Sequence, residues 1–119
     1  MKPIAQTERR VANIYTSAFT PIETHGRPDG AVLQLNTTKR PGSGFYIYKM
    51  APGTTTVAHK HVGDEEFLIL DGDLADNDGT QYGPGDLVWL RDGTEHCSTT
   101  KNGCLIAVYA EAPDNCDQV

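Results

Sequence analysis

The chain has 119 residues, a net charge of −6 at pH 7 and a sequence pI near 5.0. A chain of this length most simply forms one domain, which buries roughly two-thirds of its unfolded surface. The ten basic residues are scattered, which excludes a phosphate-tracking surface for nucleic acid and an attraction to anionic membranes. No apolar run approaches the roughly 20 residues of a membrane span. We therefore expect no nucleic-acid or membrane partner.

The start of the chain and its cysteines bear on the compartment. MKPIAQTERR lacks the apolar stretch of a secretory signal, and three cysteines are an odd number in a chain that is not disulfide-dense. Cys97, Cys104 and Cys116 also match no common zinc-finger spacing. We expect all three to be structural, in a reducing cytoplasm.

Residues 1–30 carry the weakest pattern. ERRVANIYTSAF fits a short helix or a strand, and the Pro and Gly residues of TPIETHGRPDG then break any regular element. His25 lies in this turn-rich stretch, where we expect it to be solvated and without a role. We treat residues 1–30 as an N-terminal segment that either covers the rest of the domain or swaps into a dimer.

Short β-branched and aromatic runs, separated by Gly, Pro, Asn and Asp turns, dominate the rest of the chain. They predict strands at residues 31–38, 45–50, 56–61, 65–70, 86–90, 95–100 and 104–110, with a further short strand between turns in 74–85. No convincing amphipathic helix follows residue 30. The pattern predicts a single all-β domain, an antiparallel sandwich, barrel or jelly roll, over residues 31–112, with a polar tail at 113–119.

Histidine and glutamate concentrate between Gly53 and Gly72. On a strand, His59 and His61 project from the same face and can reach one ion. After a short turn, one of the two glutamates at 65 and 66 should face that ion, and alternation alone does not say which. His96, one strand pair later, would close the site. Imidazole and carboxylate in this arrangement predict a metal site with nitrogen and oxygen ligands.

Three neutral imidazoles and one carboxylate leave open positions on an octahedral ion. Such a site can hold water, oxygen or a bidentate substrate. The ligand set suits Fe, Mn, Ni, Cu or Zn and does not choose among them. Taken alone, an H-x-H pair is often solvated and a Glu pair at a strand start is usually surface charge; their joint spacing favours the metal site.

That spacing runs from Gly53 over five residues to His59-x-His61, over three to Glu65 and over six to Gly72. It resembles the first conserved motif of the cupin superfamily, whose two histidines and glutamate are metal ligands. The resemblance implies His59, His61 and Glu65 as ligands, and so selects Glu65 over Glu66.

The second cupin motif, P-x-G-x-x-H followed by an asparagine, resembles RDGTEH. Gly93 and His96 stand at the matching positions, and the resemblance implies His96 as the fourth metal ligand. Arg91 replaces the proline and Thr100 the asparagine. These departures affect the turn and its packing rather than metal ligation.

The resemblance covers residues 30–110 and is strongest to the cupin domains of ChrR-type anti-sigma factors and to acetylacetone-cleaving dioxygenases. It implies a small double-stranded β-helix that binds one divalent metal per chain, commonly as a homodimer. The anti-sigma proteins hold their sigma factor with an extra N-terminal helical domain. The roughly 30 residues before the cupin region leave no room for one, so we expect no sigma-factor partner.

We expect a dioxygenase-type oxidoreductase acting on a small metal-chelating organic substrate. The alternatives are a non-catalytic sensor or ligand-binding cupin and a metal-dependent isomerase or lyase, since fold alone does not separate them. Catalytic residues beyond the ligands are not identified. Candidate pocket walls are Tyr46, Tyr48, Phe67 and Trp89. Leu68 and Leu70 should face outward, to be covered by the N-terminal segment or by a second subunit.

Overall fold

The computed structural model describes residues 1–111 and, as backbone, residues 116–118. Apart from one 3₁₀ turn, every regular element in this part of the chain is a β-strand, which confirms the predicted all-β fold. The elements in chain order are η1 (Gln6–Glu8), β1 (Thr20–Thr24), β2 (Arg27–Leu33), β3 (Gly44–Met50), β4 (His59–His61), β5 (Glu65–Gly72), β6 (Leu74–Asp76), β7 (Gln81–Tyr82), β8 (Leu87–Leu90), β9 (Glu95–His96), β10 (Ser98–Thr99), β11 (Cys104–Ala110) and β12 (Cys116–Gln118).

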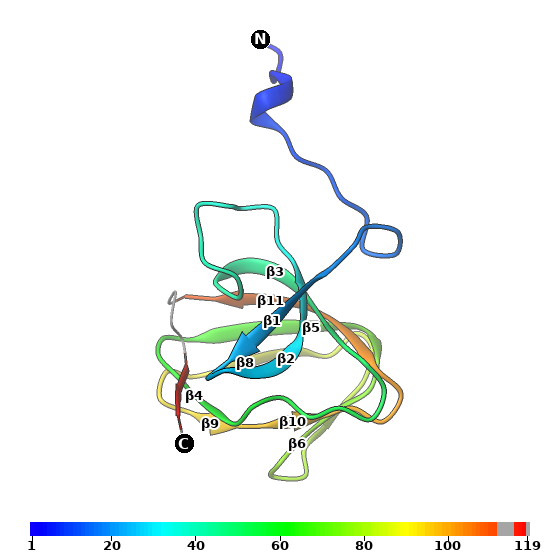
Figure 1. The fold of residues 1–119 in the computed structure, drawn as a ribbon, viewed down its shortest axis with the longest axis vertical. Coiled ribbons are helices and arrows are strands. Elements are labelled where there is room, and N and C mark those ends of the chain that lie inside the picture. The colour runs from blue at the N-terminus through cyan, green and yellow to red at the C-terminus, as the bar shows by residue number, and fades with distance from the viewer. Residues whose placement is uncertain (112–115, 119) are drawn as a thin grey trace.

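The strands form three antiparallel sheets. A six-stranded sheet has the order β1-β2-β3-β11-β5-β8, and two three-stranded sheets have the orders β10-β6-β7 and β12-β4-β9. Figure 1 shows β3, β11 and β5 above β4, β9, β10 and β6, so the six-stranded sheet and the two small sheets enclose an interior. The chain crosses repeatedly between the two walls, which is the arrangement of a small jelly-roll barrel.

Strand pleating divides the six-stranded sheet into an inner and an outer face. Phe67 and Ile69 on the inner face are only 4% and 1% exposed, whereas Leu68 between them is half-buried on the outer face. This is the predicted division of β5. The core consists of Val32, Tyr46, Met50, Phe67, Ile69, Leu74, Cys104, Ile106, Val108 and Ala110.

The chain leaves the six-stranded sheet at Gly72. This residue has a φ of +85°, and a Cβ built on it would lie 2.0 Å from the carbonyl oxygen of Gly103. Any side chain would therefore collide with the backbone of the turn before β11. The glycine lets the chain pass directly into β6 on the opposite wall.

Residues 20–30 differ from the prediction of an interrupted, turn-rich stretch. They form most of the hairpin β1–β2, in which His25 (φ 53°) and Gly26 (φ 74°) make the tight turn. Pro21 is tolerated because β1 is the edge strand of its sheet, where a missing N–H costs no ladder bond. The part of the chain that lies outside the sheets is therefore residues 1–19, which project away from the barrel in Figure 1.

Strands on the small-sheet wall are shorter than predicted. The stretch 56–61 is a strand only at His59–His61, and 95–100 is divided into β9 and β10. The polar tail predicted at 113–119 lies largely outside the described residues, although the backbone of Cys116–Gln118 pairs with β4. No helix in the described chain is long and apolar enough to cross a membrane.

Candidate metal centre

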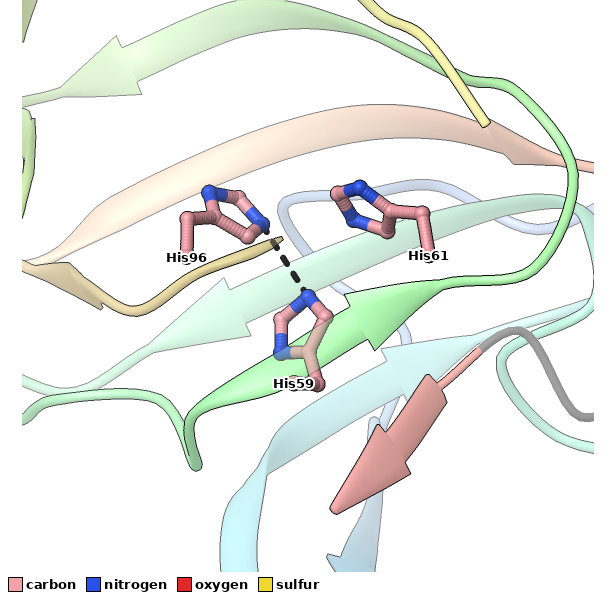
Figure 2. A group of neighbouring side chains, drawn as sticks. All are labelled: His59, His61 and His96. Carbon is pink, nitrogen blue, oxygen red and sulfur yellow. Dashed lines mark hydrogen bonds between the residues drawn. The ribbon is translucent and has the colours of Figure 1, made fainter. Parts of the chain in front are cut away.

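Three histidines converge on the inner side of the small-sheet wall. His59 and His61 lie on β4, and antiparallel pairing with β9 places His96 directly opposite His59. One ring nitrogen from each histidine lies within 4.8 Å of the others. Figure 2 shows the three rings turned toward a common point, as the strand alternation of His59 and His61 predicted.

The hydrogen bonds of His59 and His96 fix their tautomers. His59 Nδ1 lies 2.7 Å from the carbonyl oxygen of Val57, which can only accept, so Nδ1 carries the proton. His96 Nδ1 lies 3.0 Å from the Asp76 carboxylate and donates to it by the same logic. In each neutral ring, Nε2 then presents a lone pair.

A hydroxyl group holds His61 in the same tautomer, with the proton on Nδ1. Its Nδ1 lies 3.0 Å from Thr94 Oγ1, and that hydroxyl donates its own proton to the carbonyl oxygen of Arg91 at 2.7 Å. The hydroxyl therefore accepts from His61, and Nδ1 again carries the proton. Its Nε2 is buried and has no hydrogen-bond partner in the described structure.

Three Nε2 lone pairs thus point at one place. The Nε2 atoms of His59 and His96 are 3.0 Å apart, where two lone pairs repel unless a cation lies between or beside them. Burial lowers the pKa of His59. Burial also acts to lower the pKa of His96, but the hydrogen bond and charge of Asp76 outweigh it and raise that pKa. A proton on His96 can therefore bridge the pair, and a divalent metal fits the same donor set.

The two neighbouring glutamates lie on opposite faces of β5. Glu65 lies on the inner face, with its Oε2 3.4 Å from His61 Nε2 and its side chain 12% exposed. Glu66 is exposed on the outer face, opposite Trp89 in the register. Only Glu65 can therefore reach a cation held by the histidines, although its carboxylate lies beside His61 rather than among all three rings.

The turn before His96, residues 91–94, also forms hydrogen bonds with β4 and the residues that follow it. The amide of His61 donates to the carbonyl of Thr94, and the amide of Gly93 donates back to the carbonyl of His61. The Asp92 side chain accepts from the Gly63 amide at 2.8 Å. These bonds keep the turn closed with Arg91 in place of a proline, so the second motif supports His61 as well as supplying His96.

A cavity of about 860 Å³ opens onto the histidines. His59, Glu65 and His96 line its polar side, and the exposed residues Glu23, His25 and Arg40 lie around its rim. Its apolar walls include Tyr46, Tyr48, Met50, Phe67, Leu74, Ile106 and Val108. This volume is in the usual range for small-molecule sites.

Three of the predicted pocket walls, Tyr46, Tyr48 and Phe67, line this cavity. The prediction for Trp89 is wrong, because this residue is 55% exposed on the outer face of the sheet. Odd and even positions of β8 face opposite ways, and Val88 pairs with the inward-facing Phe67. His25 is exposed, as expected, and it also lies among the residues that line the cavity.

Two residues that hold the histidines were missed by sequence reasoning. Asp76 lies in a stretch of turn-forming residues, and Thr94 lies in the RDGT turn before His96. Neither position carries a local signal, because each contacts a histidine that is distant in the sequence.

Cys97 and Cys104 are free thiols, and burial raises the pKa of Cys104 to about 11, which fits a structural role. The side chain of Cys116 lies outside the described part of the chain.

Comparison with known sequences identifies one family and one partial relative. The model of the ChrR cupin-like domain matches residues 8–113. A candidate dimethylsulfoniopropionate lyase, DddL of Cereibacter sphaeroides, is 37% identical over 67 residues, which cover 54% of this chain and 28% of that protein. The chain therefore spans less than a third of this relative's length.

Solved structures share the fold at low sequence identity. The polyketide cyclase RemF of Streptomyces resistomycificus superimposes with a TM-score of 0.74 at 17% identity, over 93% of this chain and 85% of that one. ChrR in complex with SigE of Rhodobacter sphaeroides gives 0.63 at 19%, over 83% and 52%. An acetylacetone dioxygenase of Acinetobacter johnsonii gives 0.62 at 15%, over 91% and 78%.

These structures share a cupin barrel with this chain, which confirms the expected fold, and the family match runs through both histidine motifs. The chain belongs to the ChrR cupin-like domain family of the cupin superfamily.

Proposed function

We propose that this chain is a metal-dependent enzyme of dioxygenase type that acts on a small, metal-chelating organic substrate. The observation that carries the proposal is the convergence of three Nε2 lone pairs beside a cavity of about 860 Å³. A purely structural ion site is usually closed by its ligands, whereas this one faces an open cavity.

His59, His61 and His96 would hold one divalent ion, and Glu65 would complete the set from β5. A metal bound there would supply Lewis acidity toward a substrate carbonyl or enolate and open positions for further oxygen ligands. The donor set suits Fe, Mn, Ni, Cu or Zn. The backbone and side-chain partners of the histidines keep the three rings oriented, and the apolar walls limit water beside them.

The cavity suggests the shape of the substrate. Buried apolar residues such as Met50, Ile106 and Val108 form its walls, while polar groups cluster at the histidines and at the rim. A substrate with two chelating oxygens on an otherwise apolar body would match this division. β-Diketones and hydroxylated aromatic ketones have these properties.

An oxygen-uptake assay tests the proposal. Protein reconstituted with Fe(II) should consume oxygen with at least one β-diketone or hydroxylated aromatic ketone, and His59→Ala should abolish that consumption. Oxygen uptake that persists in His59→Ala would reject the assigned site. Full metal loading with no turnover of any substrate would instead support a non-catalytic sensor.

The similarity to DddL favours a second candidate, a metal-dependent lyase. An elimination reaction needs the same ion and cavity but no oxygen. Incubation of the metal-loaded protein with dimethylsulfoniopropionate under anaerobic conditions distinguishes the two. Formation of dimethyl sulfide there would favour the lyase, and turnover that requires oxygen would favour the dioxygenase.

We further propose a homodimer that covers the outer face of the six-stranded sheet. Cross-strand pairing lines up an apolar row across five strands on this face, composed of Leu33, Ile47, Ala107, Leu68 and Leu87. Phe45, Tyr109 and Trp89 lie in the adjacent row and are 62%, 49% and 55% exposed. An apolar sheet face of this extent is typical of an interaction surface.

The distribution of charge along the chain favours a second copy of the chain as the partner that covers this face. Residues 1–19 contain Lys2, Arg9 and Arg10 against Glu8, a net charge of +2, whereas the rest of the chain carries −8. The projecting basic segment of one copy is therefore complementary to the acidic barrel of another. Sedimentation of Trp89→Glu should show a monomer, while the matched surface change Gln81→Glu leaves the dimer intact. A monomeric wild-type protein at micromolar concentration would reject the proposal.

We place this protein in the cytoplasm, where its free thiols would persist.

A further inference from the structure

Asp76 is a buried carboxylate beside the histidine cluster. It is the last residue of β6, is only 8% exposed and pairs in register with Ser98 on β10. Ionised carboxylates are almost never buried without partners, because desolvation of the charge is costly. Its position on the inner wall therefore requires a set of hydrogen-bond donors.

Three side chains supply those donors. Ser98 Oγ donates to Asp76 Oδ1, Tyr82 OH donates to Oδ2 at 2.7 Å, and His96 Nδ1 donates to Oδ1 at 3.0 Å. The Tyr82 ring also packs edge-on against the ring of Phe67, with centroids 5.6 Å apart. Because all three partners come from rigid strands, both carboxylate oxygens are fixed in place.

His96 has a competing hydrogen bond on its other side. Its Nε2 lies 3.0 Å from His59 Nε2, which presents a lone pair. A neutral His96 with its proton on Nε2 would donate to His59 and would block the nitrogen that must face a cation. That tautomer would place a lone pair of Nδ1 against the Asp76 carboxylate, which is repulsive.

We propose that Asp76 is the positioning residue that keeps the proton of His96 on Nδ1 and so leaves Nε2 free for a metal. The inference rests on the proposed metal site. The other two histidines differ, because a backbone carbonyl holds His59 and a neutral hydroxyl holds His61. His96 is thus the one histidine of the cluster whose tautomer is held by a charged side chain, with Tyr82 and Ser98 holding that side chain.

Imidazole nitrogen NMR of the metal-free protein tests the tautomer directly, without any activity. At about pH 9, well above the ordinary histidine pKa of about 6.5, the wild-type protein should carry a proton on His96 Nδ1. In Asp76→Asn the side-chain amide can donate to Nδ1, so the proton should move to Nε2. Tyr82→Phe and Ser98→Ala keep the carboxylate and should keep the wild-type tautomer. His59 is the internal control and should be unchanged in all variants.

Metal affinity provides the second measurement. Zn²⁺ titration against a chromophoric chelator should show a 10- to 100-fold weaker affinity for Asp76→Asn, as is usual when an outer partner of a ligating histidine is lost. A neutral wild-type His96 with its proton on Nε2 would overturn the proposal, even if Asp76→Asn fails to fold. An Asp76→Asn protein that keeps both the tautomer and the affinity would do so as well. Failure of the wild-type protein to bind Zn²⁺ would reject the metal site, while the NMR result still decides the role of Asp76.

Discussion

The two faces of the six-stranded sheet are built from the same strands but differ in chemistry. On the inner face, Phe67 and Ile69 are buried in the core. On the outer face, Leu87 and Trp89 are 78% and 55% exposed. Alternate residues along each strand point to opposite faces. The position of a residue in this alternation, rather than its hydrophobicity, therefore decides whether it faces the cavity or the outer surface.

The adjacent pair Glu65 and Glu66 is the clearest example of this alternation. They have identical side chains and consecutive positions, yet one lies beside His61 and the other faces solvent. A register shift of one residue would exchange them. Experiments that alter one face at a time therefore test both the fold and the proposed site.

The largest effect is expected for His59→Ala. Loss of one of three converging imidazoles should remove the metal, so elemental analysis should find about one metal per wild-type chain and close to none in the variant. Leu87→Ala on the outer face is the matched control and should retain full metal. A His59→Ala protein with full metal content would contradict the ligand assignment.

A large difference in stability is expected between two apolar residues on opposite faces. Ile69 is 1% exposed, so Ile69→Ala should lower the free energy of unfolding by about 2–5 kcal/mol. Leu87 is 78% exposed, so Leu87→Ala should change it by less than about 0.5 kcal/mol. Urea unfolding at low protein concentration measures both without a contribution from association. Equal losses would show that the two faces have been assigned wrongly.

The glutamate pair should give a smaller but more specific effect. Glu65→Gln keeps the shape of the side chain but removes a charge next to His61, so it should weaken Zn²⁺ affinity measurably. Glu66→Gln makes the same chemical change on the outer face and should leave the affinity unchanged. The reverse result in chelator competition would exclude Glu65 as a ligand.

The smallest effect is expected at Asp73, where the chain passes from one wall to the other. Its carboxylate accepts from the amides of Lys101 at 2.7 Å and Asn102 at 2.9 Å, and these bonds lower its pKa. A lowered pKa stabilises the folded state above the unfolded value of about 3.9, and this contribution is lost as the pH falls through the folded-state pKa. Asp73→Ala should therefore lower the melting temperature at pH 7. The gap from wild type should narrow as the pH falls below the unfolded value of about 3.9, and a gap that widens in acid would contradict this account.

Much of the fold could be predicted because its signals are local. Turn residues and β-branched runs located most strands, and alternation placed His59 with His61 and Phe67 with Ile69. The β1–β2 hairpin was missed because Pro21 and Pro28 suggest breaks. Pro21 is acceptable on the edge strand β1, and Pro28 lies in the part of β2 that pairs with β1 alone. Trp89 was misplaced for a related reason, since a short apolar strand does not reveal which of its faces is buried.

The sequence by itself determined the all-β fold, the cupin motifs and the candidate ligands, because motif spacing and strand period are properties of neighbouring residues. Only the tertiary structure decided how those ligands are held. The carbonyl that holds His59 belongs to Val57, two residues earlier in the chain. Thr94 and Asp76 instead reach their rings through turns and cross-strand pairing, 33 and 20 residues away along the chain. Tautomers are fixed by contacts in space, and such contacts leave no pattern in the order of the residues.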